Sequence, residues 1–125
     1  MGMINIQWEF LRDVARLIVK AESLGFLVTG GELYRPLEMQ KIYVDNGRAK
    51  TLRSSHLNRL AVDFNFFLRD EKGRWRLTWN REKIKPLGDF WESLNKKNRW
   101  GGSWRGQIES GKSKFKDVPH FERRI

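Results

Sequence analysis

The stretch LAVDFNFFL, residues 60–68, decides the fold. Its side chains alternate between two faces, and alternation over this length predicts a half-buried β-strand. A carboxylate inside so apolar a strand is costly unless it is paired or bound to a metal. The alternative is that Asp63 faces solvent on the polar side of the strand, and alternation alone leaves both possibilities open. The two predicted faces are Ala61, Asp63 and Asn65, and Val62, Phe64 and Phe66.

Helices and further short strands flank this segment on both sides. The patterns predict helices over residues 7–24, 36–44 and 80–95, and strands over 26–29, 75–79 and 119–124. Residues 45–55 are polar and basic, which indicates a loop, and residues 98–117 are glycine-rich and basic. These elements predict an α+β fold, a small single domain over residues 1–125 with an antiparallel sheet packed against helices.

Two of the predicted helices carry an apolar stripe. We expect the stripes to face the core, and Trp8 and Trp91 therefore to be buried. Trp100 and Trp104 flank a Gly-Gly pair and are candidates to line a groove. The stripes are Trp8, Leu11, Ala15, Ile18 and Leu24 in the first helix, and Leu87, Phe90, Trp91 and Leu94 in the third.

Composition narrows the class of protein. The 125 residues have an apolar fraction of 39%, which suits a globular domain, and no cysteine, which excludes disulfides and thiolate metal sites. The formal net charge of +10 favours polyanionic partners such as nucleic acid, anionic lipid or acidic cell-wall polymer. No stretch approaches the roughly 18 apolar residues of a transmembrane helix. The N-terminal residues lack the pattern of a signal peptide.

The chain has two histidines, His56 and His120. His56 lies seven residues before Asp63, and His120 lies in the segment DVPHFE, residues 117–122. Catalytic zinc usually has three protein ligands, and two imidazoles with one carboxylate meet that requirement. Taken singly, each histidine fits a structural or surface role better than a ligand role, so this spacing is only suggestive.

Four segments resemble the D-alanyl-D-alanine carboxypeptidase family, which also contains phage L-alanyl-D-glutamate endopeptidases. SSHLNRLAVD (residues 54–63) resembles the family motif S-x-H-x-x-G-x-A-x-D, and residues 117–122 resemble the second motif. GELYRP (31–36) resembles the segment with the active-site arginine, and WGGSW (100–104) resembles a stretch of the endolysin branch. Arg59 stands where the motif has glycine, a position that can require a backbone conformation unsuited to arginine.

The resemblance implies roles for individual residues. His56, Asp63 and His120 would bind Zn²⁺, and Asp117 would be the general base that activates the attacking water. Arg35 would polarise the scissile carbonyl or bind a substrate carboxylate. Ser54 would hydrogen-bond a ligand or the substrate.

Two further residues are candidates for the surroundings of this site. Glu122 would orient a ligand histidine or act as a rival base, unless it forms a surface ion pair with Arg123 or Arg124. Trp104 would contact the substrate.

These roles predict a zinc peptidase that hydrolyses the peptidoglycan stem peptide, at the L-alanyl-D-glutamate bond, in phage-type lysis. We expect a monomer that is made in the host cytoplasm and acts on the cell wall after release. The alternatives are a D-alanyl-D-alanine carboxypeptidase, a non-catalytic relative with structural zinc, and a basic nucleic-acid-binding module. No helix-turn-helix, zinc-finger or RNP signature supports the last, so we expect no specific nucleic-acid partner.

Overall fold

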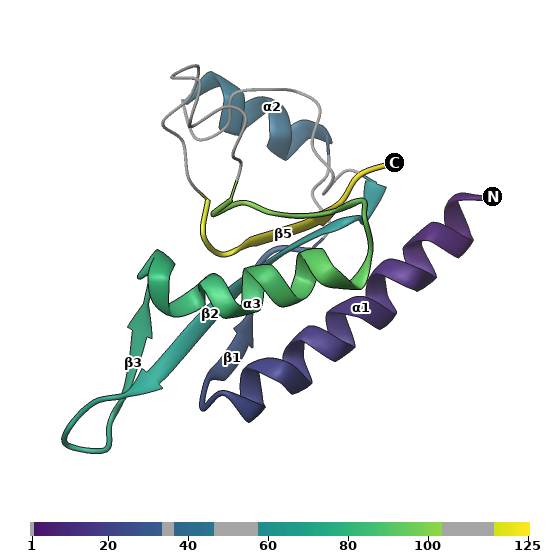
Figure 1. The fold of residues 1–125 in the computed structure, drawn as a ribbon. Helices are drawn as coiled ribbons and strands as arrows, with labels where there is room; N and C mark the ends of the chain where they lie inside the picture. Colours follow the sequence, from purple (N-terminus) through teal and green to yellow (C-terminus); the bar gives the residue numbers. More distant parts are fainter. Residues whose placement is uncertain (1, 34–36, 47–57, 104–116) are drawn as a thin grey trace.

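The computed structural model describes residues 2–33, 37–46, 58–103 and 117–125, and its elements are helices and antiparallel strands (Figure 1). This is the α+β fold that the sequence predicts. None of the described helices has the length and apolar character needed to cross a membrane. The elements in chain order are α1 (Met3–Ser23), β1 (Leu27–Gly30), α2 (Leu37–Asp45), β2 (Ala61–Arg69), β3 (Trp75–Thr78), α3 (Arg81–Leu94), β4 (Asn98–Trp100) and β5 (His120–Arg123).

β2 is the strand on which the sheet is built. β1 pairs with its middle, β3 with its C-terminal half and β5 with its N-terminal end, all antiparallel, and β4 adds to the outer edge of β5. Val62, Phe64 and Phe66 are buried, whereas Asp63 and Asn65 are half-buried. The predicted alternation is therefore confirmed, and Asp63 lies on the face opposite the core.

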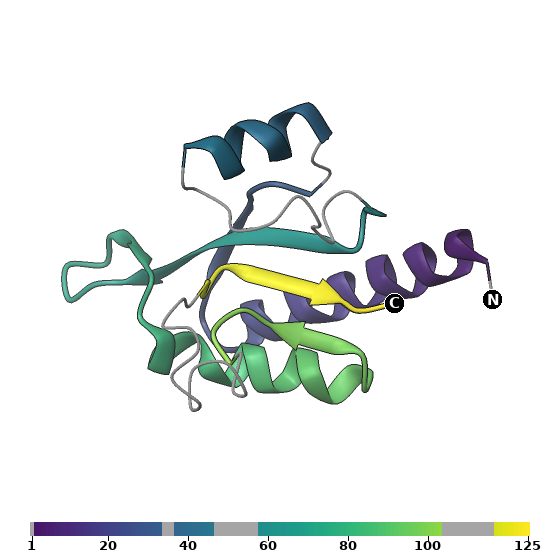
Figure 2. The same cartoon turned by 90° about the horizontal axis from the view of Figure 1, so that it is seen from above.

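The helices cover the two faces of the sheet unequally. α1 and α3 pack against the face that carries Phe64 and Phe66, while α2 lies on the other side (Figures 1 and 2). Phe10 of α1 meets Trp91 of α3 edge-on, with ring centroids 5.6 Å apart. Phe121 of β5 contacts the same tryptophan ring at 6.0 Å, so both helices and the sheet share one aromatic core.

The predicted core face of the first helix is wrong. Trp8, Leu11, Ala15 and Ile18 are exposed, as is Leu24 just after the helix, and a different stripe is buried. α1 carries two apolar stripes with the same helical spacing, and periodicity alone cannot tell which one packs inward. The buried stripe contains Phe10 together with Asp13, an aspartate that has partners elsewhere in the fold. Its members are Phe10, Asp13, Val14, Leu17 and Ala21.

A buried polar network joins α1 to the last two strands. Arg123, 3% exposed, donates to Asp13 Oδ2 at 2.6 Å and to Asn98 Oδ1 at 2.6 Å. Asn98 Nδ2 in turn donates to Asp13 Oδ2 at 3.2 Å, and Glu9 accepts from Arg123 Nη1 at 3.1 Å. Because every charge in this network is matched by a partner, the buried ions are tolerated and hold β5 against the helix layer.

Replacing Arg123 with alanine should lower the free energy of unfolding by about 3 kcal/mol, because Asp13 would keep a buried charge without its main partner. Chemical denaturation followed by circular dichroism measures the change. Arg124→Ala is the matched control: this arginine is exposed, and its loss should cost less than about 0.5 kcal/mol. Equal losses in the two variants would contradict a stabilising role for the network.

Candidate metal centre

Asp63 and His120 are brought together by strand register. They are directly opposite each other in the antiparallel pair of β2 and β5, and directly opposed residues project from the same face of a sheet. His120 Nδ1 lies 3.1 Å from Asp63 Oδ1. His120 is 7% exposed, whereas Asp63 is half-buried, so the pair has one sheltered and one accessible member.

Asp117 completes a cluster with these two residues. It begins the turn before β5, where its carbonyl accepts from the His120 backbone N–H at 3.1 Å and the chain folds back toward the histidine. One carboxylate oxygen from each aspartate and one imidazole nitrogen of His120 all lie within 4.8 Å of one another. An imidazole with two carboxylates is a donor set that suits a divalent cation such as zinc.

Glu122 forms a hydrogen bond with the other nitrogen of the His120 ring. It lies two residues along β5, on the same face, and its Oε1 is 2.7 Å from His120 Nε2. Metal-binding histidines typically donate their second N–H to a carboxylate in this way. Arg124 Nε is 4.0 Å from the other oxygen of Glu122, so the expected surface ion pair is also formed, at the limit of its range.

The two carboxylates also control the charge of His120. Burial lowers the pKa of the imidazole, but the hydrogen bonds with Asp63 and Glu122 and their negative charges raise it, to about 9 overall. At neutral pH the ring is therefore protonated unless a cation takes the place of the proton. A metal ion that binds at Nδ1 must displace the proton on that nitrogen.

Comparison with known proteins identifies the family of this chain. A model of the D-alanyl-D-alanine carboxypeptidase family matches residues 47–123, more than half of the chain and the part that contains Asp63, Asp117 and His120. The chain belongs to this family. The resemblance inferred from the sequence motifs is thereby confirmed.

The fold also has a solved counterpart. The crystal structure of the Serratia marcescens L-Ala D-Glu endopeptidase ChiX aligns with a TM-score of 0.63 and 24% identity, covering 90% of this chain and 79% of that chain. At this identity the likeness concerns the fold. A search of curated proteins gave no match.

Several predicted site residues lie outside the described part of the chain. His56, Ser54, Arg35 and Trp104 fall within residues 34–36, 47–57 and 104–116, so their roles stay predictions. The described residues bring together Asp63, Asp117, His120 and Glu122, which are half of the predicted site and come from both family motifs.

Two glycines that the sequence analysis did not single out shape the backbone of the cluster. A Cβ on Gly31 would lie 2.6 Å from the carbonyl oxygen of Asp63, and the Gly31 N–H donates to that oxygen at 2.8 Å. A Cβ on Gly101 would clash with the carbonyl of Asp117, and the Gly101 N–H donates to the carbonyl of His120 at 2.8 Å. Both glycines lie within segments that carry the family resemblance, which was the available signal.

Trp100 has a structural role, and the expectation that it lines a groove is wrong. It is fully buried, stacks on Phe121 at a centroid distance of 6.5 Å, and donates from its indole N–H to the carbonyl of Val118 at 2.7 Å. Glu92 accepts from the Trp100 backbone N–H at 3.0 Å and from the Ser103 hydroxyl at 2.6 Å. The WGGS segment thus supports the turn that carries Asp117.

Arg59 adopts the backbone conformation that the motif glycine suggests. Its φ is 58°, in the left-handed region, and among the described non-glycine residues it alone has a positive φ. The expectation that arginine could not take such a conformation at this position is wrong. The chain instead bears the strain of a Cβ in this region, about 1–2 kcal/mol.

Replacing Arg59 with glycine should leave the free energy of unfolding unchanged or raise it by up to about 1 kcal/mol, because relief of the Cβ strain offsets the added flexibility of the unfolded chain. Arg59→Val should lower it, because a β-branched residue suits positive φ least. Denaturant titration of both variants tests this. A loss of stability in Arg59→Gly as large as in Arg59→Val would show that side-chain contacts, not the backbone, govern this position.

Proposed function

We propose that the protein is a zinc-dependent peptidase that hydrolyses the stem peptide of bacterial peptidoglycan. The observation that carries this proposal is the cluster of Asp63, Asp117 and His120 inside the region that matches a peptidase family. A donor set that can bind a divalent cation, beside the Glu122 carboxylate that hydrogen-bonds the His120 ring, has the components that metal-assisted hydrolysis requires.

His56, Asp63 and His120 would hold the zinc ion, with Glu122 fixing the orientation of the His120 ring. This assignment uses two imidazoles and one carboxylate and keeps Asp117 as the additional acid–base group. When bound, the ion supplies Lewis acidity, which lowers the pKa of water and polarises a carbonyl group. The alternative assignment, in which Asp117 is itself a ligand, uses the three residues that the described structure brings together.

We assign Asp117 the role of general base. Its carboxylate would accept a proton from the attacking water and then deliver that proton to the nitrogen of the leaving amine. The backbone hydrogen bonds of Asp117 to Gly101 and His120 restrain it beside the cluster. Arg35 would stabilise the negative charge that develops on the carbonyl oxygen.

We further propose that the scissile bond joins L-alanine to D-glutamate. Support comes from the shared fold with an L-Ala D-Glu endopeptidase and from the WGGSW segment. The family description favours a second candidate, the carboxypeptidase that removes terminal D-alanine. For the biological role we propose phage-type host lysis by a monomer that accumulates in the cytoplasm before it reaches the wall.

Digestion of purified peptidoglycan separates these substrates. Mass spectrometry should find new N-terminal D-glutamate on the released peptides, with Asp117→Asn as the inactive control. Release of D-alanine alone would make the protein a carboxypeptidase. Absence of any cleavage by zinc-loaded protein would refute the peptidase proposal.

The metal assignment predicts one zinc ion per chain. His56→Ala, Asp63→Ala and His120→Ala should each weaken zinc binding strongly, because two remaining ligands rarely hold catalytic zinc. Elemental analysis after dialysis against a mild chelator measures the retained metal. Full retention in all three variants would show that the ligands are elsewhere.

The base assignment predicts that Asp117→Asn retains zinc and loses roughly a hundred- to ten-thousand-fold in turnover. Glu122→Gln should be affected less, because its amide oxygen still accepts a hydrogen bond from the imidazole. Loss of zinc from Asp117→Asn would identify Asp117 as a ligand. Near-normal turnover in Asp117→Asn together with inactive Glu122→Gln would transfer the role of base to Glu122.

A further inference from the structure

The outward face of α1 carries an apolar stripe that no other part of the described structure covers. Ile4 is 80% exposed, Trp8 59% and Val19 69%, and Leu11 and Ile18 lie between them at helical spacing. Scattered exposed apolar residues are ordinary, but a continuous stripe along a 21-residue helix is typical of an interaction surface. We define this outer stripe as Ile4, Trp8, Leu11, Ala15, Ile18 and Val19.

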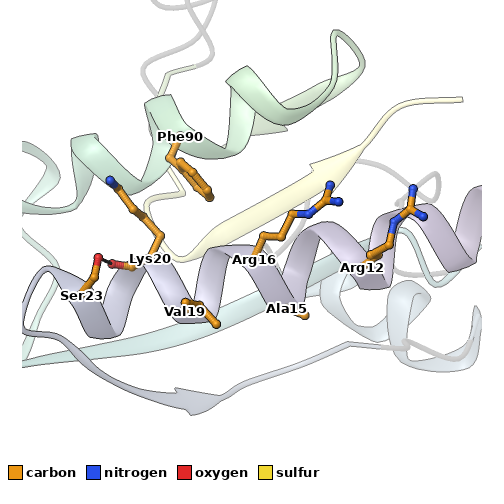
Figure 3. A pocket seen from close by; sticks show the side chains of 7 residues that line it. All are labelled: Arg12, Ala15, Arg16, Val19, Lys20, Ser23 and Phe90. Carbon is orange, nitrogen blue, oxygen red and sulfur yellow. Dashed lines mark hydrogen bonds between the residues drawn. The ribbon is translucent and has the colours of Figure 1, made fainter.

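A row of cations runs beside the outer stripe. Arg12, Arg16 and Lys20 follow one another at intervals of four residues and line a shallow depression of about 500 Å³ between α1 and Phe90 of α3 (Figure 3). Lys20 Nζ lies 5.5 Å from the centre of the Phe90 ring, and Arg16 pairs with Asp13 at 3.2 Å. The depression lies on the helix layer, away from the cluster of Asp63, Asp117 and His120.

The surface thus combines exposed apolar side chains, one of them a tryptophan, with a cationic border. A helix that lies in the plane of a membrane interface has this composition, with its apolar side among the acyl chains and its cations at anionic headgroups. The overall charge of +10 adds attraction over a longer range. Among the acidic residues of α1, Glu9 and Asp13 pair with Arg123, which leaves Glu22 as the acidic exception beside the C-terminal end of the outer stripe.

We infer that α1 docks the protein on the surface of an anionic lipid bilayer. A second copy of the chain is a poorer occupant, because each copy brings the same net charge of +10. Nucleic acid would pair with the cations but would leave the five large apolar side chains of the outer stripe exposed to water. Docking through α1 leaves the cluster of Asp63 and His120 directed away from the lipid, because Asp63 projects from the sheet face opposite the helix layer.

Co-sedimentation with vesicles tests the docking directly and does not depend on peptidase activity. The protein should bind vesicles of equal parts phosphatidylglycerol and phosphatidylcholine and should not bind phosphatidylcholine alone. The triple variant Trp8→Gln, Leu11→Gln, Val19→Gln keeps the net charge and should bind about tenfold more weakly. Thermal melts verify that each variant is folded, which is expected because the replaced side chains are exposed.

A charge-matched pair of variants separates the local cations from the general charge. Arg12→Gln with Lys20→Gln should weaken binding by about twenty-five-fold, from roughly fivefold per cation at low salt. Lys41→Gln with Lys72→Gln removes the same charge from α2 and the β2–β3 turn, and its binding should change by less than about twofold. Arg16 is left in place because it pairs with Asp13.

Three results would overturn the inference. One is equal binding to neutral and anionic vesicles, and another is an equal loss of binding in the two charge variants. The third is a dimer, seen by size-exclusion chromatography with light scattering, that becomes a monomer in the triple apolar variant. That last outcome would assign the outer stripe to a second copy of the chain.

Discussion

The register between β2 and β5 is the constraint on which the candidate site depends. Asp63 and His120 meet because they are directly opposed in the antiparallel pair, and only three residue pairs define that contact. A slip of one residue would turn His120 into the core and leave Asp63 without its partner. Two interactions keep the register: Phe121 is buried in the aromatic core, and Arg123 is bound in the polar network with α1. Packing of Phe121 and Arg123 on one face of β5 thus positions the His120 side chain on the other face.

The part of this arrangement that is local in sequence could be predicted. The alternation in residues 60–68 gave the strand and set Asp63 on the other face from Val62 and Phe64, and the family motifs gave Asp117, His120 and Glu122. The orientation of α1 could not be predicted, because its two apolar stripes have the same spacing. Their difference lies in tertiary partners: Asp13 is buried because Arg123 and Asn98, over eighty residues away, satisfy it. Such partners leave no local signal.

The glycines and Trp100 show a second limit of structure prediction from local sequence. A Gly-Gly pair between tryptophans suggests an open groove when read as a surface. In the structure the ring of Trp100 fills the space that side chains at Gly88 and Gly102 would occupy, while Gly101 lets Asp117 approach. Close approach of two backbones depends on segments distant in sequence. Arg59 is a related case, since the family motif has glycine at this position and the chain holds an arginine there at positive φ.

The hairpin between β2 and β3 offers a practical use of the fold. Its turn is fixed by Asp70, whose carboxylate accepts from the backbone N–H groups of Arg74 and Lys72; the Arg74 bond is the largest of the effects that lower the pKa of Asp70 to about 2. The tip projects beyond the body of the molecule, at the opposite end of β2 from Asp63 (Figures 1 and 2). At about 3.3 Å per residue, the strand separates the two by roughly 20 Å. A binding module grafted at this tip would therefore leave the cluster of Asp63, Asp117 and His120 and the helix layer intact, so that targeting and hydrolysis could be changed separately in a fused peptidase.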